Sequence, residues 1–148
     1  MFLRALLVAS SAFSIGAVAR AQSVENVFRE FGLIGAWAEN CAQPAGTQGG
    51  NTYTIYAVEA DGTVTLTYDS GARVAKTVNV ILRAERRGDD KIAYFQENRS
   101  SKAQIEIELV LRNDRIKVWT SRRATGETLV RDGKFASGGE SPTQARCR

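Results

Sequence analysis

The sequence contains no histidine and only two cysteines, and these shortages exclude several kinds of chemistry. Histidine is the commonest general base and belongs to the usual serine and cysteine triads. A zinc site needs about four ligands, usually cysteine or histidine, which this chain does not supply. Glu106 and Glu108 could form an acid–base pair, but their alternation with aliphatic residues indicates a solvent-exposed strand face. We therefore expect a non-enzymatic protein with no metal and no cofactor.

Long apolar runs are also scarce, and one occurs at the N-terminus. Ala5–Ala19 follows Arg4, is too short to span a bilayer, and leads into the small-x-small pattern of residues 19–21. This pattern predicts a signal peptide, residues 1–21, cleaved after Ala21. Residues 17–19 offer a second cleavage site, and an uncleaved anchor is the alternative.

Removal of 21 of the 148 residues leaves 127, enough for one domain with a single core, residues 22–148. Arg4 and Arg20 would leave with the signal peptide, so 18 basic residues would face 16 acidic ones and the net charge would fall from +4 to +2. Such a small excess gives no reason to expect a nucleic-acid partner. The mature chain has no transmembrane segment by length of apolar run, and we expect a monomer.

Two cysteines in an exported chain favour a disulfide between Cys41 and Cys147. The bridge would close a loop of roughly 100 residues, for which the chain-entropy model gives about 4–5 kcal/mol of stabilisation. Free thiols or a metal-binding pair are the alternatives. An oxidising compartment, periplasmic or extracellular and more typical of a bacterium, is the expected location.

The two ends of the mature chain carry helix signals. At residues 23–32, Ser23 can cap a short amphipathic helix and Gly32 can end it. In the tail, Ser141 and Pro142 form a second start signal, which predicts a helical turn that carries Cys147 to the rim of the fold.

Between these ends the pattern is typical of β-strands. Residues 63–68 and 103–111 alternate strictly between apolar and polar side chains, which predicts strands with one wet face. Short turn signals such as Asp61-Gly62 separate the runs, so consecutive strands should pair antiparallel. No helix-length segment lies between strands, which excludes parallel βαβ units. Further strands are expected at residues 36–38, 73–85, 91–98, 115–121 and 127–135.

We predict an all-β fold, a single antiparallel up-and-down barrel of about eight strands with short N- and C-terminal helices. An open meander of this length would expose two long edges, and closure into a barrel removes them. Eight strands enclose just enough space for side chains or one small ligand. A two-sheet sandwich is the competing arrangement.

The motif Gly35-Ala36-Trp37 resembles the G-x-W of the first strand in lipocalins and related calycin barrels. The resemblance implies that Trp37 plugs one end of the barrel and that an arginine from the last strand packs over its ring. Arg131, in "LVRDGKF", is the expected partner, and the implied role of the pair is structural.

Other resemblances concern function. The signal, the size and the early tryptophan before a cysteine are similar to small periplasmic barrel inhibitors of secreted metalloproteases, which insert their mature N-terminus into the protease cleft. The "GAWAENC" start and C-terminal cysteine also resemble uncharacterised alphaproteobacterial secreted proteins. Biotin-binding barrels line their pocket with several tryptophans, whereas this chain has two, so that class is disfavoured.

These observations favour an exported binding protein with a small apolar or amphipathic ligand inside the barrel. The residues expected to contact the ligand are Tyr53, Tyr68, Tyr94 and Trp119. One alternative is a protein-interaction module, such as a protease inhibitor that acts on a protein partner through its N-terminal segment and barrel rim. A structural envelope protein is a third hypothesis.

Overall fold

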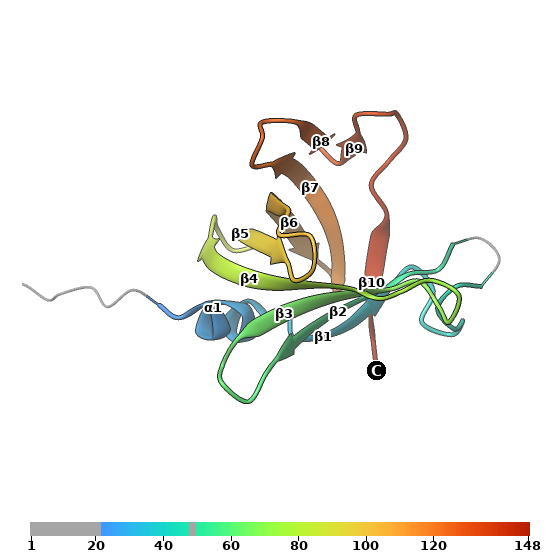
Figure 1. Cartoon of the computed structure of the whole chain (residues 1–148), viewed down its shortest axis with the longest axis horizontal. Coiled ribbons are helices and arrows are strands. Elements are labelled where there is room, and N and C mark those ends of the chain that lie inside the picture. Colours follow the sequence, from blue (N-terminus) through green and yellow to red (C-terminus); the bar gives the residue numbers. More distant parts are fainter. Residues whose placement is uncertain (1–21, 48–49) are drawn as a thin grey trace, which may run out of the picture.

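The chain forms one antiparallel sheet that closes into a barrel of eight strands (Figure 1). The computed structural model describes residues 22–47 and 50–148, so the expected signal peptide, residues 1–21, lies outside the described part. The elements of this described part are a helix and ten strands: α1 (Val24–Phe31), β1 (Gly35–Ala38), β2 (Tyr53–Val58), β3 (Val64–Asp69), β4 (Thr77–Arg86), β5 (Lys91–Asn98), β6 (Gln104–Arg112), β7 (Arg115–Arg123), β8 (Thr128–Arg131), β9 (Lys134–Phe135) and β10 (Thr143–Cys147).

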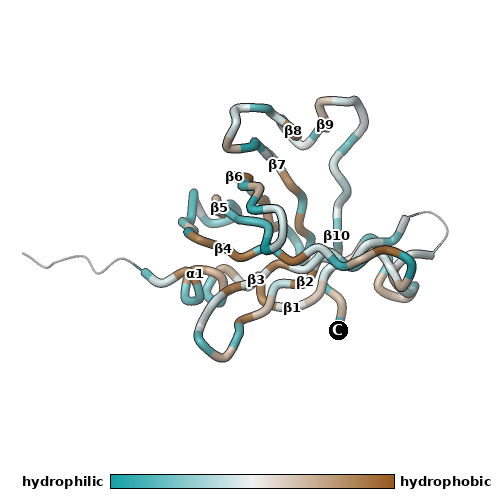
Figure 2. Tube along the Cα trace, in the orientation of Figure 1, coloured by the Kyte–Doolittle hydropathy of each residue, from teal (hydrophilic) through white to brown (hydrophobic). Residues whose placement is uncertain are grey.

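The barrel wall consists of β1 to β7 in chain order, with β10 inserted between β7 and β1. The predicted up-and-down barrel is therefore confirmed, and the two-sheet sandwich is not found among the described strands. Along the strands, hydrophobic and hydrophilic positions interleave (Figure 2), as expected where one face is buried and the other is wet.

The predicted helix at the N-terminal end forms where the cap signals place it. The Ser23 side chain accepts a hydrogen bond from the backbone N–H of Asn26, and Gly32 ends the helix with a φ of 78°. The apolar face of α1 turns toward the barrel and buries Val27, Phe28 and Phe31. No helix in residues 22–47 and 50–148 is long and apolar enough to cross a membrane.

α1 closes one end of the barrel with an aromatic cluster. The Phe28 side chain is fully buried, and its ring centroid lies 5.6 Å from that of Tyr56 and 5.5 Å from that of Tyr94. The hydroxyls of Tyr56 and Tyr94 are 2.9 Å apart and share a hydrogen bond. Trp37, which is also fully buried, belongs to the same core. This end of the barrel is therefore filled.

The prediction of a second helix at the C-terminal end is wrong. Thr143–Cys147 is strand β10, which pairs with β1 on one side and with β7 on the other. A single helical turn would satisfy few backbone groups, whereas the strand forms two hydrogen-bonded ladders and removes both barrel edges. The local capping signal at Ser141 is thus overridden by the closure of the sheet.

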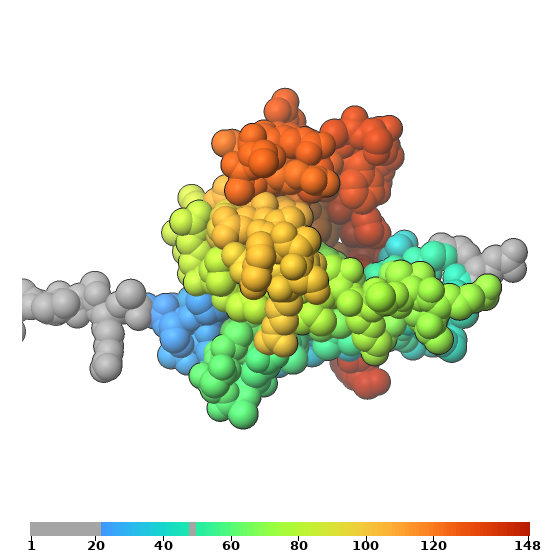
Figure 3. Space-filling view, in the orientation of Figure 1, coloured from blue at the N-terminus to red at the C-terminus, as the bar shows by residue number. Residues whose placement is uncertain are grey.

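The segment 127–135 also differs from the prediction, because it forms two short strands outside the barrel wall. β8 pairs with the last part of β7, through Ser121 opposite Val130, and turns back into β9. In Figure 3 this hairpin (orange) stands above the rest of the molecule. The sequence pattern predicted that residues 127–135 form the last strand of the barrel wall, and β10 occupies that position instead.

Candidate ligand-binding cavity

A cavity of about 400 Å³ occupies the end of the barrel opposite α1. Its walls come from the ends of the strands that point away from the helix and from the β8–β9 hairpin. The lining side chains with apolar character include Ile105, Ile107 and Leu109 of β6, Ile116 and Val118 of β7, and Leu129, Val130 and Phe135 of the hairpin. The polar ones within the barrel include Thr54, Tyr68, Gln96, Ser121 and Gln144.

The β8–β9 hairpin supplies one side of the cavity. β7 pairs with β10 near Ile116 and Lys117, and then changes its partner to β8 at Ser121. The tip of the hairpin bonds to β7 between the part paired with β10 and the part paired with β8, because Gly133 N–H donates to Trp119 O at 2.9 Å. Gly133 has a φ of 72°, a left-handed backbone conformation that favours glycine, and a Cβ there would lie 2.8 Å from the flexible end of the Lys117 side chain.

Phe135 marks the mouth of the cavity. It is 41% exposed, one of three large apolar residues with a high exposed fraction in the described chain, and it lines the cavity as well. Val130, in the same hairpin, is buried. An apolar molecule in the cavity would therefore cover surface that Phe135 now presents to water.

Gln96 is the most deeply buried polar residue of the lining, with 2% of its surface exposed. Its Oε1 atom accepts no hydrogen bond from any residue of 22–47 or 50–148. Tyr68 lies beside it. Burial raises the pKa of the Tyr68 hydroxyl to about 12, and the Gln96 side chain opposes part of this rise. Tyr68 is therefore protonated at neutral pH, and its hydroxyl can donate as well as accept.

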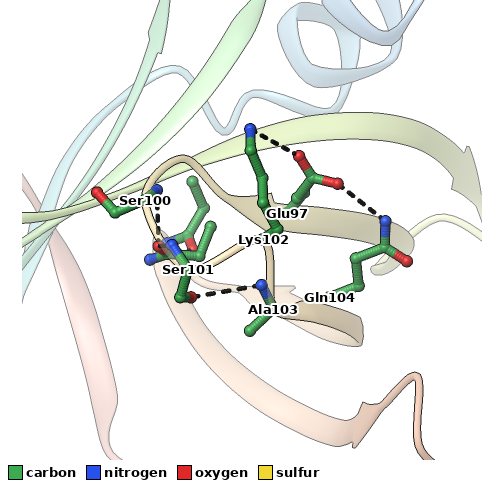
Figure 4. Close-up of polar contacts among 8 residues, drawn as sticks. Glu97, Ser100, Ser101, Lys102, Ala103 and Gln104 are labelled. Carbon is green, nitrogen blue, oxygen red and sulfur yellow. Dashed lines mark hydrogen bonds and ion pairs between the residues drawn. The ribbon is translucent and has the colours of Figure 1, made fainter.

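The position of Gln96 is set by the turn between β5 and β6. Asn98 Oδ1 accepts from the backbone N–H groups of Ser100 and Ser101, at 3.0 and 2.8 Å. Glu97, on the outer face of β5, contacts Lys102 and Gln104 at 3.2 and 2.9 Å (Figure 4). These bonds hold the β5–β6 register, in which Gln96 faces the barrel interior.

Charged groups near the cavity lie at its rim. Lys117 Nζ is 2.6 Å from Glu140 Oε2, and Glu39 is exposed. The interior lining therefore offers apolar contact and hydrogen bonds with neutral groups. No family model, curated protein or solved structure matches this chain.

The four aromatic residues predicted to contact a ligand are distributed over three environments. Tyr68 lines the cavity. Tyr94 is buried deeper, in the aromatic cluster under α1. Tyr53 and Trp119 are on the outer face, where Tyr53 Oη donates to Cys41 O and Gln43 O, and Lys91 Nζ lies 5.5 Å from the Trp119 ring. Strand alternation explains the outcome, because neighbouring Val118 and Thr54 take the inward positions.

Trp37 packs against an arginine as predicted, but that arginine is Arg146 and not Arg131. The guanidinium carbon of Arg146 lies 4.3 Å from the centroid of the Trp37 ring. Arg131 is exposed at the end of β8, away from this ring. The correction follows from that of the C-terminal tail: the last strand of the barrel wall is β10, so an arginine of β10 faces the tryptophan.

The disulfide between Cys41 and Cys147 is present, with a Cα–Cα distance of 5.3 Å. It joins the loop after β1 to the end of β10. Sequence reasoning missed Gln96, Thr54, Ser121 and Gln144 as cavity residues. A usable signal existed for Gln96, because it lies two positions after Tyr94 and so shares its strand face. The others follow only from the closure of the barrel.

Proposed function

We propose that this chain is a non-enzymatic, exported binding protein that holds a small apolar or amphipathic ligand in its barrel. The supporting observation is the cavity of about 400 Å³ at the end opposite α1. Sites for small molecules commonly measure about 300–1,000 Å³ and combine a mainly apolar lining with a few convergent polar groups. The aliphatic residues of β6 and β7 and the polar pair Tyr68 and Gln96 fit that description.

Export is supported by the disulfide, because such bonds persist in oxidising compartments. The carrier function is also supported by the shape of the barrel, which is closed at one end and open at the other. α1 and Trp37 seal that end, so a ligand would pass through the mouth beside Phe135.

The contacts of α1 argue against a protease inhibitor that acts by inserting its N-terminal segment. An inhibitor that inserts its N-terminal segment needs residues 22–34 exposed and detachable. Phe28 and Leu33 are fully buried, and Phe31 is 5% exposed. Removing these side chains from the core would expose large apolar surfaces. The carrier is therefore the function we favour.

Native mass spectrometry of the exported, oxidised protein tests the proposal, together with titration of the neutral fluorescent probe N-phenyl-1-naphthylamine. We expect a reproducible extra mass that disappears on denaturation, or saturable uptake of the probe. Val118→Phe places a larger side chain in the cavity and should abolish both signals. Val74→Phe is the matched control, because Val74 is 56% exposed and outside the lining.

Two results would contradict a carrier function. One is a wild-type protein that holds neither cargo nor probe. The other is a signal that survives Val118→Phe unchanged in a folded protein, since the bound molecule would then lie elsewhere.

A further inference from the structure

Gln96 presents an unused hydrogen-bond acceptor to the cavity. Its side chain lines the cavity and is 2% exposed, and within residues 22–47 and 50–148 its Oε1 atom has no hydrogen-bond partner. Buried polar groups are nearly always paired, because an acceptor that gives up water without a replacement is costly. The atom therefore points to a donor that residues 22–47 and 50–148 do not supply.

Packing alone does not account for an amide at this position. The cross-strand neighbours of Gln96 are Ile81 on β4 and Ile105 on β6. An apolar side chain of similar length would suit these neighbours and leave no acceptor unpaired. The turn of residues 99–103 fixes the strand register, so Gln96 cannot turn outward without moving β5.

The charges around the cavity restrict the donor to a neutral group. A ligand ammonium at Gln96 would find no carboxylate beside it among the described lining residues, since Glu39 is at the exposed rim. A ligand carboxylate would be desolvated without a free cation from the part of the lining that the structure describes, because Lys117 is paired with Glu140. A hydroxyl or an amide N–H can be buried at lower cost than a charged group, and it supplies the hydrogen-bond donor that Oε1 lacks.

Tyr68 completes a site for such a group. Its hydroxyl remains protonated up to strongly alkaline pH and lies next to the Gln96 side chain. A ligand hydroxyl can donate to Gln96 and accept from Tyr68 at the same time. From there the apolar wall of Ile105, Ile107 and Val118 leads toward Phe135 at the mouth.

On the proposed carrier function, we infer that the cavity selects a neutral amphipathic ligand that enters polar end first and donates a hydroxyl or amide hydrogen to Gln96 Oε1. The apolar remainder of the ligand lies along β6 and β7, and its outer end covers Phe135. Gln96 and Tyr68 are thus the specificity-determining residues of the site.

Isothermal titration calorimetry with 1-decanol, decyl methyl ether and decanoate tests this assignment. The ether keeps the chain and the oxygen but has no donor, and decanoate replaces the neutral head with an anion. We expect 1-decanol to bind about tenfold more tightly than the ether, the effect of about one hydrogen bond. It should also bind more tightly than decanoate, whose charge would be desolvated. Gln96→Met should bring the ratio of alcohol to ether close to one, mainly by weakening the alcohol.

Asn79→Leu is the matched control. Asn79 is also buried on the barrel interior and has an unpaired amide atom within the described residues, Nδ2, but it is not part of the cavity lining. It should keep the wild-type ratio. Gln96→Asn, which retains an amide but withdraws the acceptor, serves if the methionine variant does not fold, and it should also lose the preference.

The outcomes separate this inference from the carrier function itself. Equal binding of alcohol and ether, a preference that survives Gln96→Met, or tighter binding of decanoate would overturn the role of Gln96 while leaving a carrier. Absence of binding by all three compounds would overturn the inference, and the naphthylamine titration then decides whether the carrier function falls too.

Discussion

Arg146 and Trp37 are direct cross-strand partners on β10 and β1, and the Arg146 guanidinium lies over the Trp37 ring at 4.3 Å. The indole Nε1–H donates to Leu33 O at 2.9 Å. Arg146 donates to the backbone carbonyls of Gly32 and Ile34, which belong to the short connection between α1 and β1. One cation–π pair thus ties together the first strand, the last strand and the helix that closes the barrel.

Truncation of this pair should destabilise the fold. Trp37→Ala removes a fully buried side chain, and we expect a loss of about 3–5 kcal/mol in the free energy of unfolding. Arg146→Ala removes charge-assisted hydrogen bonds to two carbonyls and should cost about 2–3 kcal/mol. Arg131→Ala, at an exposed site, should stay within about 0.5 kcal/mol of wild type. Urea denaturation measures all three, and equal effects at Arg131 and Arg146 would refute the pairing.

Loss of the disulfide should lower stability without changing the fold. Cys41 and Cys147 are separated by 106 residues, and the chain-entropy model gives about 4–5 kcal/mol for a loop of this length. β10 is paired on both sides, so the double variant Cys41→Ser/Cys147→Ser should retain the barrel. Circular dichroism and thermal unfolding, compared with the oxidised wild type, check both statements. An unchanged melting temperature would show that the bridge does not constrain the unfolded chain.

Much of the barrel could be predicted because its signals are local. Strict alternation in residues 103–111 and turn dipeptides such as Asp61-Gly62 specify strands and hairpins, and these appear as β6 and the β2–β3 turn. The closure could not be read in the same way. The tail of residues 141–148 carries a helix-capping signal, and only its two neighbouring strands make it β10. Long-range pairing overrode local preference there.

The candidate site was harder to predict than the fold for a related reason. Alternation tells which residues share a face, but not which face is interior where aromatic residues occupy both. Tyr53 and Trp119 therefore looked equivalent to Tyr68, although they lie outside. The space for the cavity depends on β7 exchanging β10 for β8, a relation between segments that no single segment encodes.

The hydroxyl pair of Tyr56 and Tyr94 should behave as a unit in stability measurements. The two oxygens are 2.9 Å apart in a fully buried environment. Tyr56→Phe or Tyr94→Phe alone leaves the other hydroxyl unpaired and should cost about 1–3 kcal/mol. The double variant removes both polar groups and should cost less than the sum of the single variants. A double-mutant cycle by urea denaturation measures this coupling. Strict additivity would show that each hydroxyl has another partner.

Alkaline pH should unfold the protein over a narrow range, because the barrel buries three tyrosine hydroxyls. Burial raises the pKa of Tyr68 to about 12, and it also raises the pKa values of Tyr56 and Tyr94 well above that of a free tyrosine. In the unfolded chain each has a pKa of about 10. The fold therefore favours the neutral forms, and their stabilising contribution is complete below about pH 10 and is lost as the pH rises through the folded values.

The expected slope follows from linkage. Between the unfolded pKa of about 10 and its own folded value, each of the three tyrosines lowers the free energy of unfolding by about 1.4 kcal/mol per pH unit, so together they remove about 4 kcal/mol per unit. Tyrosinate absorbance and circular dichroism should then change together. Tyr56→Phe/Tyr94→Phe should reduce the tyrosine contribution to the slope to about one third, and this comparison identifies the buried tyrosines as its source. Ionisation of all three hydroxyls near pH 10 in a protein that keeps its dichroism would mean that water reaches the barrel interior at both ends.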